Sequence, residues 1–100
     1  NSTIISFFEE CMAERSESRI SDNWTTGRIY KAYKFWCKDN NNGYAKTVRE
    51  FRDELADHLG TTFQAMVVRH GTGGSFYRDY TLSADAIEQF RGCDYEDFLI

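Results

Sequence analysis

The stretch that most constrains the fold is AKTVREFRDELADHLG at residues 45–60, because it contains the start, one apolar face and the end of a single helix. Thr47 and Glu50 have the spacing of a capping box, in which a hydroxyl and a carboxylate each accept a hydrogen bond from a backbone N–H. Gly60 is the residue type that commonly follows a helix end. The apolar residues between these ends recur at spacings of three and four: Val48, Phe51, Leu55 and Leu59. We therefore predict a helix from about Thr47 that packs this face against a core.

The opposite side of this predicted helix is polar and partly basic. Lys46, Arg49 and Arg52 lie near its N-terminal half, together with Asp53. A helix that enters the DNA major groove carries its base and phosphate contacts in this half. A solvated surface helix shows the same pattern and, for this segment alone, is the more common explanation.

The chain length of 100 residues supports one domain with one core. Aromatic residues make up 16% of the chain, so the core can be dense. The chain opens with Asn1, and we expect it to be a piece of a longer protein. No window approaches the ~20 apolar residues that cross a bilayer, and no secretory signal is visible. We therefore expect a cytoplasmic chain with no membrane partner.

The residue types that build enzyme and metal sites do not form a recognisable pattern. Cys11, Cys37 and Cys93 are far apart and lack metal-ligand spacing. His58 and His70 have no neighbouring nucleophile or acid in a known arrangement, and no nucleophile elbow, P-loop or dinucleotide fingerprint occurs. We therefore expect no catalytic residues, no metal and no cofactor.

The charges are unevenly distributed along the chain. The net charge of −4 argues against a nucleic-acid partner. Residues 28–78 hold nine Lys and Arg against five acids, a balance of +4, and the flanks hold three against eleven, a balance of −8. A chain with its bases in the central elements can still present one positive face.

Two amphipathic helices are predicted before the central one. Residues 3–14 carry an apolar stripe of Ile4, Ile5, Phe8, Cys11 and Met12. A second helix begins at Thr25 or Thr26 and reaches about Lys38, with a stripe of Ile29, Ala32, Tyr33, Trp36 and Cys37. Its other surface carries Arg28, Lys31, Lys34 and Lys38, a pattern that is more often a solvated face than a binding stripe. Residues 15–23 between the helices form a loop or a short strand around Ile20.

After the central helix, two β-type runs at residues 63–70 and 75–82 flank a glycine-rich tip and predict a hairpin. Ser83 then caps a short helix to Arg91, with Ile87 and Phe90 facing inward. The order predicts an α+β winged helix–turn–helix with a three-helix core, a C-terminal hairpin wing and a short final helix. Ile20 is a candidate for a third strand of the wing sheet.

The order of elements is accompanied by a resemblance in sequence. The matching residues are Phe8-x-Glu10-Cys11, Ile29-Tyr30-x-x-Tyr33-x-x-Trp36-Cys37, Phe51 with Leu55, and Arg78-x-Tyr80-x-Leu82. On these residues nearly the whole chain resembles the C-terminal winged-helix domain of phage and plasmid replication primase–helicases, a group that includes poxvirus-type and satellite-phage-type superfamily-three helicases. The resemblance implies a small nucleic-acid-binding module whose parent enzyme carries its catalysis in other domains.

The leading functional hypothesis is therefore non-catalytic binding of DNA, with duplex favoured, for a replication primase or helicase. The expected contacts in or along the major groove come from Lys46, Thr47, Arg49 and Arg52, and those to phosphates from Arg69, His70, Arg78 and Lys31. The competing hypothesis is a protein-interaction or oligomerisation module that binds other domains or subunits of the helicase. Tyr77, Tyr44 and Phe35 would supply its aromatic surface patch.

Overall fold

The computed structural model describes residues 2–15, 24–39, 44–69 and 74–91. Its elements in chain order are α1 (Thr3–Cys11), β1 (Met12–Glu14), α2 (Thr26–Asp39), α3 (Val48–His58), α4 (Phe63–Met66), β2 (Val67–Arg69), β3 (Ser75–Tyr77), β4 (Tyr80–Leu82) and α5 (Ala84–Arg91). The chain is thus a mixed α+β protein with two small antiparallel sheets, β1–β4 and β2–β3. Within the described ranges, no helix is both long enough and apolar enough to span a bilayer.

Helix α1 is shorter than the sequence predicts. Ser2 caps it by accepting a hydrogen bond from the Ile5 N–H at 3.3 Å, and the helix ends at Cys11. The next three residues form β1, in which Met12 pairs with Leu82 and Glu14 with Tyr80. The predicted helical continuation to Glu14 is therefore wrong, because pairing with β4 takes this segment into a strand.

Helix α2 confirms its prediction almost to the residue. The Thr25 hydroxyl accepts a hydrogen bond from the Arg28 N–H at 3.2 Å, which makes Thr25 the cap. All five residues of the predicted apolar stripe are buried: Ile29, Ala32, Tyr33, Trp36 and Cys37. Tyr30 and Phe35 are partly buried and pack against the same core.

Helix α3 has the predicted ends. The Thr47 hydroxyl accepts from the Glu50 N–H, and the Glu50 carboxylate accepts from the Thr47 N–H, both at 3.2 Å. Gly60 has φ +73°, and its N–H donates to Asp57 O at 3.0 Å while the Thr61 N–H donates to Ala56 O at 2.9 Å. This pair of bonds is a Schellman motif, which needs a left-handed residue at Gly60.

The predicted hairpin is confirmed only next to its tip. Val67 pairs with Tyr77 and Arg69 with Ser75. Residues 63–66 form α4 instead of a strand, and the far half of the second run becomes β4, which pairs with β1. A bend at residues 78 and 79 separates β3 from β4, and there the Arg78 N–H donates to Met66 O at 2.9 Å. The predicted strand at Ile20 and the hairpin tip at 70–73 lie outside the described residues.

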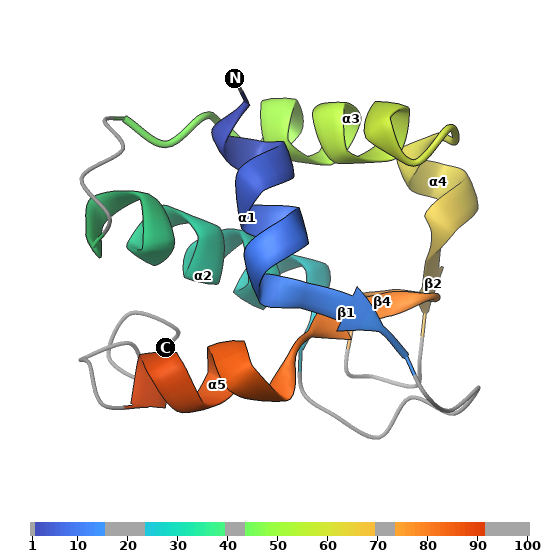
Figure 1. The fold of residues 1–100 in the computed structure, drawn as a ribbon. Helices are drawn as coiled ribbons and strands as arrows, with labels where there is room; N and C mark the ends of the chain where they lie inside the picture. Colours follow the sequence, from blue (N-terminus) through green and yellow to red (C-terminus); the bar gives the residue numbers. More distant parts are fainter. Residues whose placement is uncertain (1, 16–23, 40–43, 70–73, 92–100) are drawn as a thin grey trace.

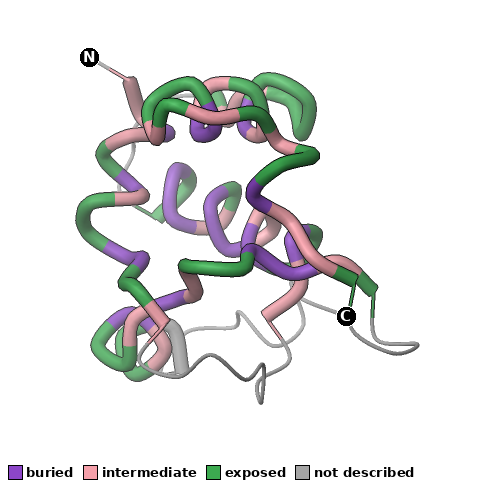
Figure 2. The backbone as a smooth tube through the Cα atoms, turned by 90° about the vertical axis from the view of Figure 1, so that its right-hand side faces the viewer, coloured by how far each residue is buried: buried purple, intermediate pink, exposed green. Residues whose placement is uncertain are grey.

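The core is an aromatic cluster where α1 crosses α2 and α3 (Figure 1). The Phe7 ring lies 5.6 Å from Tyr33, 5.8 Å from Trp36 and 6.1 Å from Phe51, centroid to centroid. Buried residues line the inner sides of the helices, and exposed residues line the outside (Figure 2). Helix α5 packs against α1, and its cap Ser83 accepts from the Ala86 N–H at 3.1 Å. The cluster holds α2 and α3 at fixed positions, so their outer faces are rigid surfaces.

Candidate nucleic-acid interface

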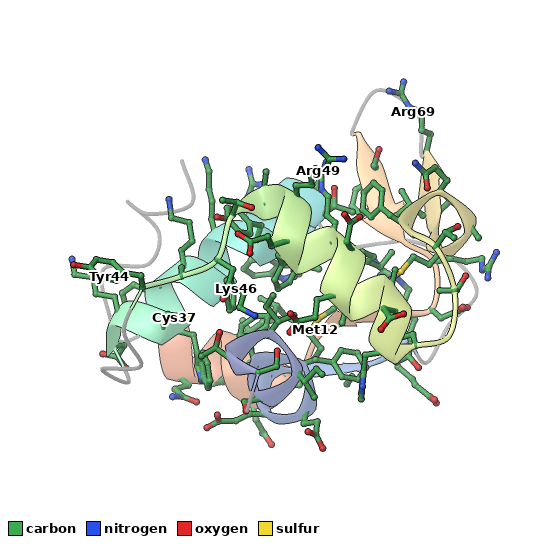
Figure 3. The ribbon with its side chains drawn as sticks, turned by 90° about the horizontal axis from the view of Figure 1, so that it is seen from above. Met12, Cys37, Tyr44, Lys46, Arg49 and Arg69 are labelled. Carbon is green, nitrogen blue, oxygen red and sulfur yellow. The ribbon has the colours of Figure 1, made fainter. Side chains whose placement is uncertain are left out.

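Lys46 precedes α3 and is tied to its own chain. Its Nζ lies 2.9 Å from a carboxylate oxygen of Glu54, and the hydroxyl of Ser2 donates to the other oxygen. The hydrogen bond to this carboxylate and its charge raise the pKa of Lys46. The Lys46 backbone accepts from the Tyr30 hydroxyl at 2.7 Å, and its N–H donates to the Tyr33 hydroxyl at 3.1 Å. Its side chain turns toward α1 (Figure 3), so a phosphate would have to compete with Glu54 for this ammonium group.

Thr47 is occupied by the helix cap. Its hydroxyl accepts from the Glu50 N–H and also lies 3.0 Å from the Glu50 carboxylate, to which it donates. These backbone and side-chain hydrogen bonds lower the pKa of Glu50, which keeps the carboxylate charged. A charged carboxylate therefore stands beside Thr47 at the start of α3.

Arg49 is the predicted contact residue that the structure leaves most accessible. Its side chain is 91% exposed, and its Nε lies 3.9 Å from the Asp53 carboxylate one turn later. An exposed i,i+4 pair of this length constrains an arginine weakly. Arg49 projects away from the domain, toward the same edge of the molecule as Arg69 (Figure 3).

Arg52 packs against the neighbouring helix. Its guanidinium lies 4.6 Å from the centroid of the Phe63 ring in α4, and its Nε is buried without a hydrogen-bond partner. This cation–π contact joins α3 to α4, which leads into β2. Arg52 therefore has a structural role that the sequence pattern does not reveal.

Replacing Arg52 with alanine should lower the free energy of unfolding by about 1–2 kcal/mol, because it removes the contact with Phe63 and the packing of the aliphatic stem. Arg49→Ala is the matched control and should leave stability nearly unchanged, since its side chain is in solvent. Urea unfolding of both variants measures the difference. Equal stabilities would show that the Arg52–Phe63 contact contributes nothing.

The remaining predicted phosphate contacts are Arg69, His70, Arg78 and Lys31. Arg69 is exposed at the end of β2. Arg78 lies at the bend after β3, where its guanidinium is 3.4 Å from the neighbouring Asp79 carboxylate. His70 lies outside the described residues. Lys31, on α2, is half-buried. Of the predicted contact residues, the structure thus brings Arg49 and Arg69 to one edge and engages Lys46, Thr47, Arg52 and Arg78 with their own chain.

The aromatic patch expected for a protein-interaction module does not form as predicted. Tyr77 is only 1% exposed, so it belongs to the core and is wrong as a surface residue. Phe35 is partly buried against the core, whereas Tyr44 is fully exposed. The alternation of side chains along residues 75–82 could not show that Tyr77 faces the core, because β3 and β4 belong to different sheets.

The cysteines that the structure describes, Cys11 and Cys37, are buried free thiols. Burial raises the pKa of the Cys11 thiol to about 12, so this thiol is protonated at neutral pH. Within the part of the chain that the structure describes, no group of three or more His, Cys, Asp or Glu side chains could hold a metal ion.

Three further bases are candidates for the interface, on a face of α2 that the sequence predicts to be solvated. Arg28, Lys34 and Lys38 are all exposed on α2. The signal for them was the helical spacing of the bases on this segment. Assigning them to an interface required knowing which bases elsewhere are paired.

The comparisons with known proteins give one match. The family described as poxvirus D5 protein-like matches residues 1–92. No curated protein and no solved structure matches the chain significantly.

Proposed function

Because the chain belongs to the poxvirus D5 protein-like family, which is associated with primase–helicase proteins, we propose that it is a non-catalytic nucleic-acid-binding module of a phage- or plasmid-type replication primase–helicase. Duplex DNA is the favoured ligand. The module would help the parent enzyme engage an origin or a fork.

The arrangement of elements supports this proposal, because it is compatible with a winged helix. Helix α1 and strand β1 precede the α2–α3 pair, and an antiparallel hairpin follows. Strand β4, which follows the β2–β3 hairpin, pairs with β1, so the end of the hairpin is anchored next to α1. In helix–turn–helix proteins the second helix of the pair lies in the major groove and the first crosses the backbone.

The observation that carries the proposal is the position of two exposed arginines. Arg49 at the start of α3 and Arg69 at the end of β2 come from different elements and project to one edge (Figure 3). Two cations fixed on rigid elements are suited to contacting phosphates of one nucleic-acid molecule.

Duplex DNA binding measured across salt concentrations tests the proposal. If four or five of the exposed bases Arg28, Lys34, Lys38, Arg49 and Arg69 contact phosphates, log K should fall against log salt with a slope of roughly −4. Arg49→Gln should flatten this slope by about 0.9 and weaken binding on the order of tenfold at about 50 mM salt. Ser6→Asp, at an exposed position of α1, changes the net charge by the same amount as Arg49→Gln and should leave the salt slope unchanged. No duplex binding at low salt would overturn the proposal.

A protein-interaction or oligomerisation module of the same enzyme is the second candidate. The observation that favours it is Tyr44, a large aromatic residue that is fully exposed. A concentration-dependent dimer in light scattering, lost on Tyr44→Ser, would support this candidate. A monomer at all concentrations that binds DNA would exclude oligomerisation and support the first.

A further inference from the structure

The outer face of α3 is a poor match for a nucleic-acid groove. Between Val48 and His58 the helix carries four acids against two arginines, and Glu50, Asp53 and Asp57 are exposed. One of the two arginines, Arg52, is stacked on Phe63. Insertion of α3 into the major groove would bring these carboxylates close to phosphates, which is unfavourable.

The outer face of α2 has the opposite character. Its bases form what we term the α2 basic row: Arg28, Lys31, Lys34 and Lys38. At 100° per residue they fall within an arc of about 120° and extend over roughly 15 Å of helix. The first turn of α2 contains no acid, and Asp39 at the last position is the helix's one acidic residue.

The pairing of bases also distinguishes the two helices. Around α3 and the wing, Lys46 pairs with Glu54, Arg49 with Asp53 and Arg78 with Asp79. Within the described residues no ion pair involves Arg28, Lys34 or Lys38, and the Lys34 ammonium lies 5.8 Å from the ring centroid of Tyr30. Their charges are therefore free to attract an anion.

The α2 basic row begins beside the wing. A Cβ placed on Gly74, at the start of the β3 segment, would lie 3.7 Å from the methyl group of Thr25, the cap of α2. The next residue, Ser75, pairs with Arg69. In Figure 3 the start of α2, Arg49 and Arg69 lie along the upper edge of the view. The wing arginine and the α2 basic row therefore belong to one continuous surface.

From these observations we infer that the phosphate backbone of a nucleic acid docks along α2 and the wing, with α3 outside the groove. This inference rests on the proposed nucleic-acid binding and replaces the expected reader helix by a backbone-binding helix. Because phosphates carry no sequence information, binding depends little on base sequence.

The test uses two double variants and two duplexes of unrelated sequence. Lys34→Gln/Lys38→Gln should flatten the salt slope by about 1.8 and weaken binding on the order of a hundredfold at about 50 mM salt. Asp53→Asn/Asp57→Asn on the exposed face of α3 should leave the slope unchanged and alter affinity by less than about threefold. Both duplexes should bind equally. Circular dichroism melting of each variant checks that the fold is retained, as glutamine is a good helix former.

The outcomes separate this inference from the proposed function. If the unaltered chain binds no duplex at low salt, the proposed function fails. If it binds, but Lys34→Gln/Lys38→Gln has the unaltered slope, the docking surface on α2 is wrong while the function stands. A large affinity gain in Asp53→Asn/Asp57→Asn, or strong preference for one duplex, would place α3 in the groove and likewise overturn the inference.

Discussion

Phe51→Ala should lower the free energy of unfolding by about 3–5 kcal/mol, because the Phe51 ring is fully buried and central to the aromatic cluster. Its centroid lies 4.9 Å from that of Tyr33 and 5.6 Å from that of Tyr30. The variant loses these two ring contacts and the contact with Phe7, and it leaves a cavity between α1, α2 and α3. For a domain of this size the melting temperature should fall by roughly 12–40 °C.

Val48→Ala is the matched control for this prediction. Val48 lies on the same helix, one turn earlier, but is 38% exposed. Val48→Ala should lower the free energy of unfolding by less than about 1 kcal/mol, since little buried surface is lost. Thermal and urea unfolding of the two variants give the comparison. A loss below 1 kcal/mol for Phe51→Ala would mean that the aromatic cluster is not the core that holds α3 in place.

The sequence predicted the elements whose signals are local. The capping box of Thr47 and Glu50 and the turn at Gly60 depend on residues a few positions apart, and both are confirmed. The stripe of α2 is confirmed for the same reason, because helical spacing alone determines which side chains share a face.

The errors occur where tertiary contacts decide the conformation. Met12–Glu14 would continue α1 by propensity, but its pairing with β4 comes from a segment about seventy residues away in sequence. Phe63–Met66 is a single helical turn capped by Thr62, which accepts from the Ala65 N–H at 3.3 Å. Four residues are too few to show a helical period, and the two valines that follow them favour a strand, so the sequence predicts a strand from residue 63.

The candidate site was harder to predict than the fold, because charge pattern does not reveal pairing. Arg49 and Arg52 are equivalent in sequence, yet one is in solvent and the other stacks on Phe63. The partner of Lys46, Glu54, lies two turns farther along the chain. These contacts decide which bases of α3 are engaged within the chain, and a charge pattern in the sequence does not show them.

Tyr77→Ala should destabilise the domain by about 3–5 kcal/mol, whereas Tyr77→Phe should be neutral or stabilising. The ring is buried, with its centroid 6.2 Å from that of Phe63, so truncation opens a cavity between β3 and α4. The hydroxyl is buried without a hydrogen-bond partner. Removing it therefore breaks no bond and ends the cost of its desolvation.

The pH dependence of stability supplies an independent test of this buried hydroxyl. Burial raises the pKa of Tyr77, against a smaller opposing effect of the Arg52 charge. Because the folded-state pKa lies above the unfolded value, ionisation of Tyr77 has no effect on stability below about pH 10, and stability falls as the pH rises further, because only the unfolded chain ionises. In urea titrations above pH 10, Tyr77→Phe should thus lose stability less steeply than the unaltered chain. If Tyr77→Phe lowered the free energy of unfolding by more than about 1.5 kcal/mol at pH 7, the hydroxyl would have a hydrogen-bond partner. If the variant and the unaltered chain lost stability equally steeply above pH 10, the hydroxyl would reach solvent.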